Sequence, residues 1–474
     1  MKISRISTVL WLNVAVLTLG IGMVTAQSTS TARPLLQDIR VFKDEPVPAA
    51  TPGVRRTASS SPVMRDDVSP AVLSANGVKT SIPLLAETNI PGYSGVIVES
   101  LEGNIVVEKD SHLPYNPASN VKIATTYAVL KAFGPDHRFP TNVWTDGAFE
   151  KETATLHGNL YITGRDPVFS YEDAIRIANE LNRMGIRTIK GDLVVTDNFT
   201  INYQASSSRS AQLLFTTLDA SKRAAAATRA WGTYRRYSVN SKTLNEIPNV
   251  SFTGSVYTQP MPTNVNMLFS HESAPMKDII KAMMAYSNNT LSELLGDLVG
   301  GPYGIARTVH SGASVPPIEF NIQTASGLGI NRVTPRAMLK VVRELRSDLE
   351  RWKMTLADVM PVAGMDNGTL EGRFASDYSR GSVVGKTGTL IRTDAGASAL
   401  SGEMNTRSGR FLFVIFNQRG NVPGFRSFQN NYISLIQGQF GGPASLGYAP
   451  VALEARLART KVTFPESRAR TASE

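Results

Sequence analysis

Strand and helix patterns that would together form one domain occur in two separate blocks, one near each end of the chain. Residues with another pattern lie between the two blocks. Near the start, the β-branched runs YSGVIVES and NIVVEKD, joined by the turn residues LEGN, predict a β-hairpin. A helix then begins through Pro117 and Ser119 and ends near Phe133. Near the other end, three strands and a closing helix are predicted for GSVVGKTGTL, ASALSGEMN, GRFLFVIFN and FRSFQNNYISLIQGQF. The pattern therefore predicts one domain whose sequence is interrupted by an insert.

The central material has the pattern of a small α/β unit. A strand in GNLYITG, a helix in EDAIRIANELNRMGIR and a strand in TIKGDLVVTDNF follow one another. We expect this insert at residues 146–261, and the interrupted domain at 85–145 and 262–447. Another helix is expected at about 274–299. With 474 residues, the chain exceeds the roughly 250–300 residues of a single core, so two domains of mixed α/β (α+β) class are the natural reading.

The two ends of the chain differ from the body. Residues 1–26 run from Lys2 and Arg5 through an apolar stretch to small residues before Ala26, which is typical of a cleaved secretory signal; an uncleaved membrane anchor is the alternative. Residues 27–84 are rich in Ser, Thr, Pro, Ala and Arg, and predict a flexible tether. Residues 448–474 have a similar composition and predict a mobile basic tail. We therefore expect an exported protein, periplasmic in a bacterium with two membranes.

Composition excludes several classes of chemistry. The chain has no cysteine, so disulfides, thiolate nucleophiles and cysteine-ligated zinc are excluded. Its histidines are scattered without metal-binding or triad spacing, namely His112, His137, His157, His271 and His310. The formal net charge of +10 comes without a nucleic-acid-binding motif, and attraction to an acidic polymer of the cell envelope suits it better. We expect no metal and no nucleic-acid partner.

Three short motifs carry the chemistry. Ser-x-x-Lys occurs once, at Ser119 to Lys122, and Lys-Thr-Gly occurs once, at Lys386 to Gly388. Ser-x-Asn occurs at Ser74, Ser238 and Ser287. We select Ser287 to Asn289, because it lies in a predicted helix between the other two motifs. Each motif alone is usually chance or a turn, and it is their presence together and in this order that indicates a site.

Ser119 and Lys122 have a joint chemical meaning. Positions i and i+3 share one face of a helix, so the hydroxyl and the amine can come within hydrogen-bond reach. A serine hydroxyl becomes a good nucleophile when a base removes its proton, and an amine is a base only when it is neutral. Burial among apolar neighbours, the positive end of a helix dipole and a second cation, Lys386, would each lower the pKa of Lys122. We therefore predict Ser119 as nucleophile and Lys122 as general base.

The other motifs complete a catalytic cycle. Ser287 is predicted to pass a proton to the leaving amine, and Asn289 to hold Lys122 or the substrate backbone. Lys386 and Thr387 are predicted on an edge strand where they can bind a substrate carboxylate, and Gly388 would leave room for a peptide alongside. The backbone N–H groups of Ser119 and Thr389 are candidate oxyanion-hole donors.

With these motifs in place, the sequence resembles the penicillin-binding serine DD-peptidases, and within them the class C low-molecular-mass carboxypeptidase/endopeptidase group of the DacB type. Those enzymes carry the same motifs in the same order, with a large insert between the first and the second. Here 164 residues, 123–286, separate Lys122 from Ser287. Further likeness extends over roughly 85–447, in the stretches GPDHRF, GNLYITGRDP, GDLVVTDNF, YSVNSKTL, TASGLGINRVTP and PVAGMDNGTLEGRF.

The resemblance implies both a fold and an activity. The implied fold is a β-lactamase/transpeptidase-like domain, with an antiparallel sheet flanked by helices, plus a smaller inserted α/β domain. The implied activity is hydrolysis of D-alanyl-D-alanine, or of D-alanyl cross-links, in peptidoglycan stem peptides through an acyl-enzyme on Ser119. No cofactor is implied, and β-lactam antibiotics are the expected inhibitors.

The chain also departs from the family pattern. Thr324–Leu328 replaces the usual Asp-Gly-Ser-Gly-Leu, Asn288 stands where aspartate is frequent, and IRTD after KTGTL looks like an insertion beside the active-site strand. We expect these differences to affect substrate preference more than the class of reaction. The sequence leaves the balance of carboxypeptidase and endopeptidase activity, the third residue of the stem peptide and the oligomeric state open.

Two other functions stay open on the sequence alone. A serine β-lactamase or esterase could use the same motifs, but it would need an acidic residue to position a deacylating water, and none can be assigned. A non-catalytic protein that binds the anionic cell wall through its excess of cations is the second alternative.

Overall fold

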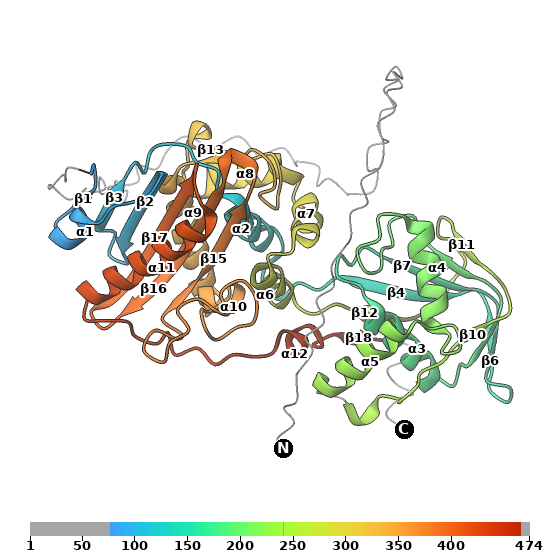
Figure 1. The fold of residues 1–474 in the computed structure, drawn as a ribbon. Helices are drawn as coiled ribbons and strands as arrows, with labels where there is room; N and C mark the ends of the chain where they lie inside the picture. Colours follow the sequence, from blue (N-terminus) through green and yellow to red (C-terminus); the bar gives the residue numbers. More distant parts are fainter. Residues whose placement is uncertain (1–75, 240, 466–474) are drawn as a thin grey trace, which may run out of the picture. The chain divides into compact units, whose positions relative to one another are not determined.

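The computed structural model describes residues 76–239 and 241–465 (Figure 1), all within one compact unit of the chain. The predicted signal and most of the predicted tether lie outside the described residues. Within the described ranges, none of the helices has both the length and the apolar character needed to cross a bilayer.

The larger domain is built on a sheet in which every pair of neighbouring strands is antiparallel. Its strands, in spatial order, are β1 (Lys79–Thr80), β3 (Ile105–Lys109), β2 (Tyr93–Ser100), β17 (Gly409–Gln418), β16 (Ala397–Thr406) and β15 (Val383–Leu390). The predicted hairpin is β2–β3 and the three predicted late strands are β15, β16 and β17. Segments from the two ends of the sequence therefore share one sheet, as the interrupted pattern predicts.

Both faces of this sheet are covered by helices (Figure 1). Along β17, side chains alternate between two apolar cores, since successive residues of a strand point to opposite faces. Leu412, Val414 and Phe416 lie in the core that contains α2 (Val121–Phe133) and α9 (Pro335–Arg351). The intervening residues lie in the core that contains α11 (Val422–Gln439), and they are Phe411, Phe413 and Ile415. Burial on both faces explains why this strand is apolar almost throughout.

Among the described residues, further helices of this domain accompany α2, α9 and α11. They are α1 (Pro83–Glu87), α6 (Met276–Tyr286), α7 (Asn289–Asp297), α8 (Gly301–Gly312) and α10 (Leu356–Val359). Short 3-10 turns occur at η1 (Ala118–Asn120), η3 (Pro317–Glu319) and η4 (Thr393–Ala395), and β13 (Phe320–Asn321) pairs with β14 (Arg332–Val333).

The predicted single helix at about 274–299 is wrong, because the chain breaks into α6 and α7 at Ser287. Ser287 has φ 55° and ψ 41°, in the left-handed region, and ends α6. The side chain of Asn288 then caps α7 by accepting a hydrogen bond of 3.0 Å from the backbone N–H of Leu291. The second motif therefore lies on a tight junction between two helices, where its side chains are not stacked along one helical face.

The insert is α/β, as predicted. Its main sheet contains, in order, β11 (Val256–Thr258), β9 (Leu193–Val195), β7 (Leu160–Gly164), β4 (Pro140–Thr145), β12 (Asn266–Glu272) and β18 (Lys461–Thr463). The first three are parallel and the others antiparallel. A smaller sheet contains β10 (Ser251–Phe252), β8 (Thr188–Lys190), β6 (Thr155–His157) and β5 (Ala148–Glu150). The helices are α3 (Tyr171–Arg183), α4 (Ser207–Leu218) and α5 (Ala225–Tyr237), with a 3-10 turn η2 (Ser241–Thr243).

The insert sheet extends beyond the predicted range of 146–261. Strands β4 and β12 flank that range in the sequence and pair with each other inside the sheet, where neither is an edge strand. The predicted limits of the insert follow turn residues, and these turns mark only where strands end. Because β4 pairs with β7 of the insert and β12 pairs with β4, both belong to the insert.

The predicted ends of the ordered chain need correction. Strand β1 and the start of α1 lie in the range predicted as tether, and β1 pairs with β3. In the range predicted as mobile tail, α12 (Leu453–Leu457) and β18 are ordered. Two contacts explain this order, since β18 pairs with β12 and Arg456 Nη1 donates a hydrogen bond of 2.9 Å to the buried carboxylate of Asp278. The last residues, 466–474, lie outside the described part.

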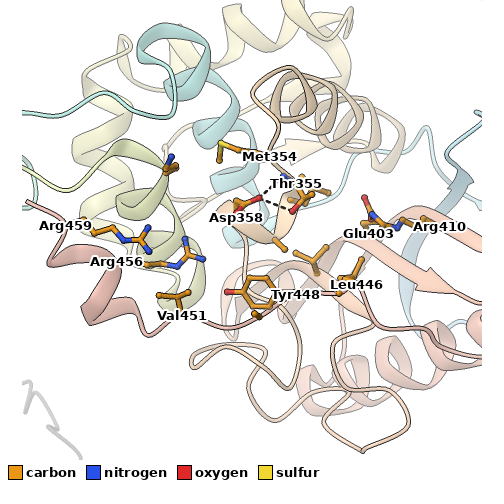
Figure 2. A pocket seen from close by; sticks show the side chains of 16 residues that line it. Met354, Thr355, Asp358, Glu403, Arg410, Leu446, Tyr448, Val451, Arg456 and Arg459 are labelled. Carbon is orange, nitrogen blue, oxygen red and sulfur yellow. Dashed lines mark hydrogen bonds and ion pairs between the residues drawn. The ribbon is translucent and has the colours of Figure 1, made fainter. Parts of the chain in front are cut away.

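The C-terminal segment also borders a pocket of about 500 Å³ in the larger domain (Figure 2). Tyr448, labelled there, donates a hydrogen bond of 2.8 Å to Asp366, and its ring lies 4.7 Å from the amine of Lys281. Lys281 is fully buried and donates to Asp366 at 2.6 Å. Burial lowers the pKa of Lys281 to about 8, against the opposing effect of Asp366. The segment is thus fixed to the domain by a buried polar network.

Candidate active site

The first motif lies where the chain enters α2. Ser119 is in the 3-10 turn η1, immediately before α2, and Lys122 is the second residue of that helix. Ala118, just before the serine, has φ 47°, a left-handed conformation that residues with a side chain rarely adopt. Lys122 Nζ lies 3.1 Å from Ser119 Oγ. The contact that the i, i+3 spacing predicts is present.

The amine of Lys122 has two further neighbours. It donates hydrogen bonds of 2.7 Å to Asn289 Oδ1 and 2.6 Å to the backbone oxygen of Ser326. An amide oxygen and a backbone oxygen can only accept hydrogen bonds. A neutral amine has two N–H groups, and these two oxygens accept from both of them. The nitrogen lone pair is then left facing Ser119 Oγ. This arrangement suits an amine that accepts the serine proton.

Burial controls the charge of this amine. The Lys122 side chain is fully buried. Burial lowers its pKa from 10.5 to about 7, while the nearby carboxylate of Glu293 opposes the shift. A substantial fraction of the amine is therefore neutral at neutral pH. Of the causes that the sequence suggests, desolvation is the one that dominates.

The second motif reaches the site through Asn289. This residue begins α7 and contacts Lys122, which is the first of the two contacts that the sequence left open for it. Ser287 is half-buried at the α6–α7 junction, in its left-handed conformation. Its predicted role in passing a proton remains a prediction.

The third motif lies on β15, which is the edge strand of the sheet (Figure 1). Lys386 is fully buried, and its amine donates a hydrogen bond of 2.8 Å to the backbone oxygen of Thr387. Burial lowers the pKa of Lys386 well below its ordinary value, with the charge of Lys122 adding to the effect. Thr387 and Thr389 are half-buried on the opposite face of the strand, and Arg426 donates a hydrogen bond of 2.8 Å to Thr389 Oγ1. The predicted edge-strand position is therefore correct.

Direct contacts join the first motif to the third. Asn120 Nδ2 donates a hydrogen bond of 3.0 Å to the backbone oxygen of Lys386. A Cβ atom on Gly388 would lie 2.7 Å from the backbone oxygen of Pro117 and 3.0 Å from Ala118 Cβ. The missing side chain thus makes room for the turn before Ser119, and the expectation that Gly388 also leaves room for a peptide alongside the strand remains a prediction. Glycine here lets the nucleophile turn approach the strand.

Comparison with known sequences decides the family. The sequence pattern of the D-Ala-D-Ala carboxypeptidase 3 (S13) family matches residues 84–216 and 241–427, which include all three motifs. The chain belongs to this family. The predicted resemblance to DacB-type enzymes and the predicted class of enzyme, a serine DD-peptidase that acts on peptidoglycan, are thereby confirmed.

Two curated relatives support the assignment of this S13 peptidase. A D-alanyl-D-alanine carboxypeptidase of Actinomadura sp. (strain R39) is 24% identical and covers 75% of this chain and 84% of the relative. The carboxypeptidase DacB of Mycolicibacterium smegmatis is also 24% identical and covers 89% of this chain and 95% of the relative.

The fold of the S13 peptidase also has solved relatives. A predatory peptidoglycan endopeptidase of Bdellovibrio bacteriovorus, Bd3459, has a TM-score of 0.65 and 21% identity, covering 79% of this chain and 100% of the relative. Penicillin-binding protein 4 of Haemophilus influenzae has a TM-score of 0.53 and 21% identity, covering 76% of this chain and 99% of the relative. These similarities confirm the predicted transpeptidase-like fold.

One residue of the S13 peptidase site, Glu293, was not predicted from the sequence. Glu293 lies four residues after Asn289 in α7, and its carboxylate accepts hydrogen bonds of 3.0 Å from the N–H of Ala325 and 2.9 Å from that of Ser326. It thereby holds the carbonyl of Ser326 against Lys122. The i, i+4 spacing from Asn289 was an available signal, but its partners lie more than thirty residues away in the sequence.

A second feature is an acidic pocket of about 380 Å³ that Asn288 lines. Its carboxylates include Asp166 and Glu172, and Tyr203 and Tyr286 supply aromatic surface. Burial raises the pKa of Asp166 well above its ordinary value, with Asp173 adding to the effect. Burial also raises the pKa of Glu172, again with a contribution from Asp173. The pocket therefore gathers several carboxyl groups beside the second motif, and burial makes Asp166 and Glu172 harder to ionise than free carboxyls.

Proposed function

We propose that this S13 peptidase cleaves the bond before the terminal D-alanine of peptidoglycan stem peptides, D-alanyl cross-links, or both, with Ser119 as nucleophile and Lys122 as base. The observation that carries the proposal is the buried amine of Lys122, 3.1 Å from Ser119 Oγ and with a pKa lowered to about 7. A buried, partly neutral amine against a hydroxyl is what activation of serine requires. Carboxypeptidase and endopeptidase reactions share this step and differ in the leaving group.

The cycle begins with attack of Ser119 Oγ on the D-alanyl carbonyl carbon, while the hydroxyl proton passes to Lys122 Nζ. The C–N bond then breaks, and Ser287 relays the proton to the leaving amine. Water then attacks the resulting ester and gives one proton to Lys122 Nζ. The C–O bond to Ser119 breaks, and Lys122 passes this proton to Ser119 Oγ, which regenerates the neutral amine and the hydroxyl. The N–H groups of Ser119 and Thr389 are proposed to hold the oxyanion in both halves.

Substrate is proposed to lie along β15. This strand is at the edge of its sheet, so an extended peptide can pair with it. Lys386 and Thr387, with Thr389 beside the exposed guanidinium of Arg426, are proposed to receive the substrate carboxylate. At the other motif, the acidic pocket favours an amine on the stem peptide, and both diaminopimelate and lysine carry one. β-Lactams, which also present a carboxylate, are the proposed inhibitors.

Export of the enzyme belongs to the same proposal. Peptidoglycan is assembled outside the cytoplasmic membrane, and residues 1–26 have the pattern of a secretory signal. Fractionation of cells that express the full chain, with sequencing of the mature N-terminus, tests it. A new terminus at residue 27 in the exported fraction is expected, and full-length protein in the cytoplasm contradicts it.

Purified enzyme should be incubated with uncross-linked and cross-linked muropeptides, with products analysed by mass spectrometry. Loss of one alanine identifies carboxypeptidase activity, and conversion of dimers to monomers identifies endopeptidase activity. Ser119→Ala should abolish both reactions, whereas Ser427→Ala, at an exposed position of α11, should retain them. Intact muropeptides with wild-type enzyme would contradict the proposal.

Labelling by a fluorescent penicillin separates the remaining alternatives. A long-lived, stoichiometric adduct on Ser119 is expected of a peptidase. Rapid turnover of nitrocefin would favour a β-lactamase instead. Cell-wall binding that survives in Ser119→Ala, without any cleavage by the wild type, would favour a non-catalytic wall-binding protein.

A further inference from the structure

The segment IRTD after the third motif ends in a strained turn, in which Asp394 contacts Asn116, three residues before the nucleophile. Asp394 and Ala395, in η4, have φ values of 52° and 53°, and Gly396 follows with φ 92°. Consecutive left-handed residues with side chains persist only where their surroundings hold them. The backbone N–H of Arg419 contributes by donating a hydrogen bond of 3.2 Å to the oxygen of Asp394.

The carboxylate of Asp394 binds two other segments at once. Arg332, in β14, donates hydrogen bonds of 2.7 Å to Oδ1 and 3.1 Å to Oδ2. Asn116 Nδ2 donates a hydrogen bond of 2.7 Å to Oδ2. Burial alone would raise the pKa of Asp394, but these hydrogen bonds lower it overall, so the group is a carboxylate at neutral pH.

Asn116 continues the chain of contacts to the nucleophile. This residue is fully buried, and its Oδ1 accepts a hydrogen bond of 3.0 Å from the N–H of Ala118. The same amide donates a hydrogen bond of 3.0 Å to the oxygen of Gly329. Ala118 is the left-handed residue immediately before Ser119. The amide of Asn116 therefore connects the strained turn at Asp394 with the strained turn before Ser119.

We propose that Asp394 is a positioning residue, which orients the amide of Asn116 and thereby holds the turn that presents Ser119 to Lys122. The proposal rests on the proposed role of Ser119. Without the carboxylate, the Asn116 amide loses one of its two acceptors, and Ala118 can relax from its left-handed conformation. A displacement of about 1 Å of the nucleophile is enough to slow a reaction by about 100-fold.

Arg332 should matter less than Asp394, although the two form an ion pair. In Arg332→Ala the carboxylate of Asp394 still accepts from Asn116, whereas in Asp394→Ala it does not. The order of the two effects therefore distinguishes a relay through Asn116 from simple stabilisation by an ion pair.

The test compares acylation rates and melting temperatures. A matched control is Glu99→Gln, because Glu99 accepts two hydrogen bonds from Arg343, as Asp394 does from Arg332. The side chains of the two arginines are similarly exposed, 39% for Arg343 and 38% for Arg332. We expect Asp394→Ala to slow acylation of Ser119 by a fluorescent penicillin by at least about tenfold, and Arg332→Ala by less than about threefold. Glu99→Gln should lower the melting temperature without slowing acylation.

A double-mutant cycle gives a second test. It measures whether Asp394 acts on the acylation rate through Asn116, which a general loss of stability would not produce. In Asn116→Ala the relay is already broken, so adding Asp394→Ala should slow acylation by less than about twofold more. A full tenfold further loss, or equal loss of rate in Glu99→Gln and Asp394→Ala, would overturn the proposal. A wild type that never acquires a label on Ser119 would overturn the proposed function, and this inference with it.

Discussion

Asn289 Oδ1 accepts a hydrogen bond of 2.7 Å from Lys122 Nζ, so a neutral amide faces the proposed base. An uncharged acceptor holds the amine without favouring its protonated form. Asn289→Asp would place a negative charge there and raise the pKa of Lys122 above its present value of about 7. We expect acylation by penicillin at pH 7 to slow by about fivefold or more, and the midpoint of its pH profile to move up by at least about one unit.

Asn264→Asp provides the control for this change, because it adds the same charge at an exposed position of the insert. Its pH profile should match that of the wild type. Rates measured from pH 5.5 to 9.5 check both variants, and an unmoved midpoint in Asn289→Asp would show that Lys122 does not set the profile.

Lys122→Met should change how stability depends on pH. The pKa of Lys122 is about 7 in the folded enzyme and about 10.5 when the chain is unfolded, so between these values the unfolded state binds more protons. The free energy of unfolding of the wild type therefore rises with pH in this window. Relative to Lys122→Met, we expect the wild type to gain about 2–4 kcal/mol from pH 7 to pH 10.

Urea denaturation at several pH values measures this difference. The control is Lys151→Met, which removes an exposed lysine and should run parallel to the wild type. Parallel curves for Lys122→Met as well would mean that the amine is not perturbed by burial.

Gly388→Ala should separate the nucleophile turn from β15. The new Cβ would lie 2.7 Å from the Pro117 oxygen, and that backbone must shift to accept it. We expect acylation to slow by at least about tenfold and the free energy of unfolding to fall by about 1–3 kcal/mol. Gly372→Ala is the matched control, because a Cβ there meets nothing within 4 Å. Equal kinetics of the two variants would count against a close approach of the turn to the strand.

Truncation tests the correction of the predicted tail. Ending the chain at residue 447 removes β18 from the edge of β12 and removes Arg456 from the buried carboxylate of Asp278. Loss of one partner of a buried pair costs about 3–5 kcal/mol, so we expect a large fall in melting temperature and rapid proteolysis. A chain ending at residue 465 should behave like the full chain. If both truncations behave alike, the ordered C-terminal segment adds no stability.

The sequence predicted the parts of the site that depend on local geometry. Ser119 and Lys122 are three residues apart on one helical face, and their contact follows from that spacing. The β pattern of GSVVGKTGTL likewise predicts the strand that carries the Lys-Thr-Gly motif. These features need no knowledge of distant partners.

Features that depend on distant partners were missed or misread. Glu293 accepts hydrogen bonds from amides that lie far from it in the sequence, and Asp394 is likewise distant from its partner Asn116. No periodicity in the sequence indicates such pairs. Apolar residues with helical spacing occur on both sides of the polar stretch SNNT at 287–290, so the pattern suggested a single helix across the break at Ser287. Similarly, α12 and β18 are too short to show a period, and their order comes from Asp278 and β12.

The pairing of β2 with β17 also bears on how the chain is made. Residues 93–100 of β2 reach the outside of the ribosome long before residues 411–418 of β17, with which they must pair. Most strands of the insert are synthesised in between, so that unit can assemble while the larger sheet still lacks its middle strand. The nascent enzyme therefore stays without its reactive centre until translation is almost finished.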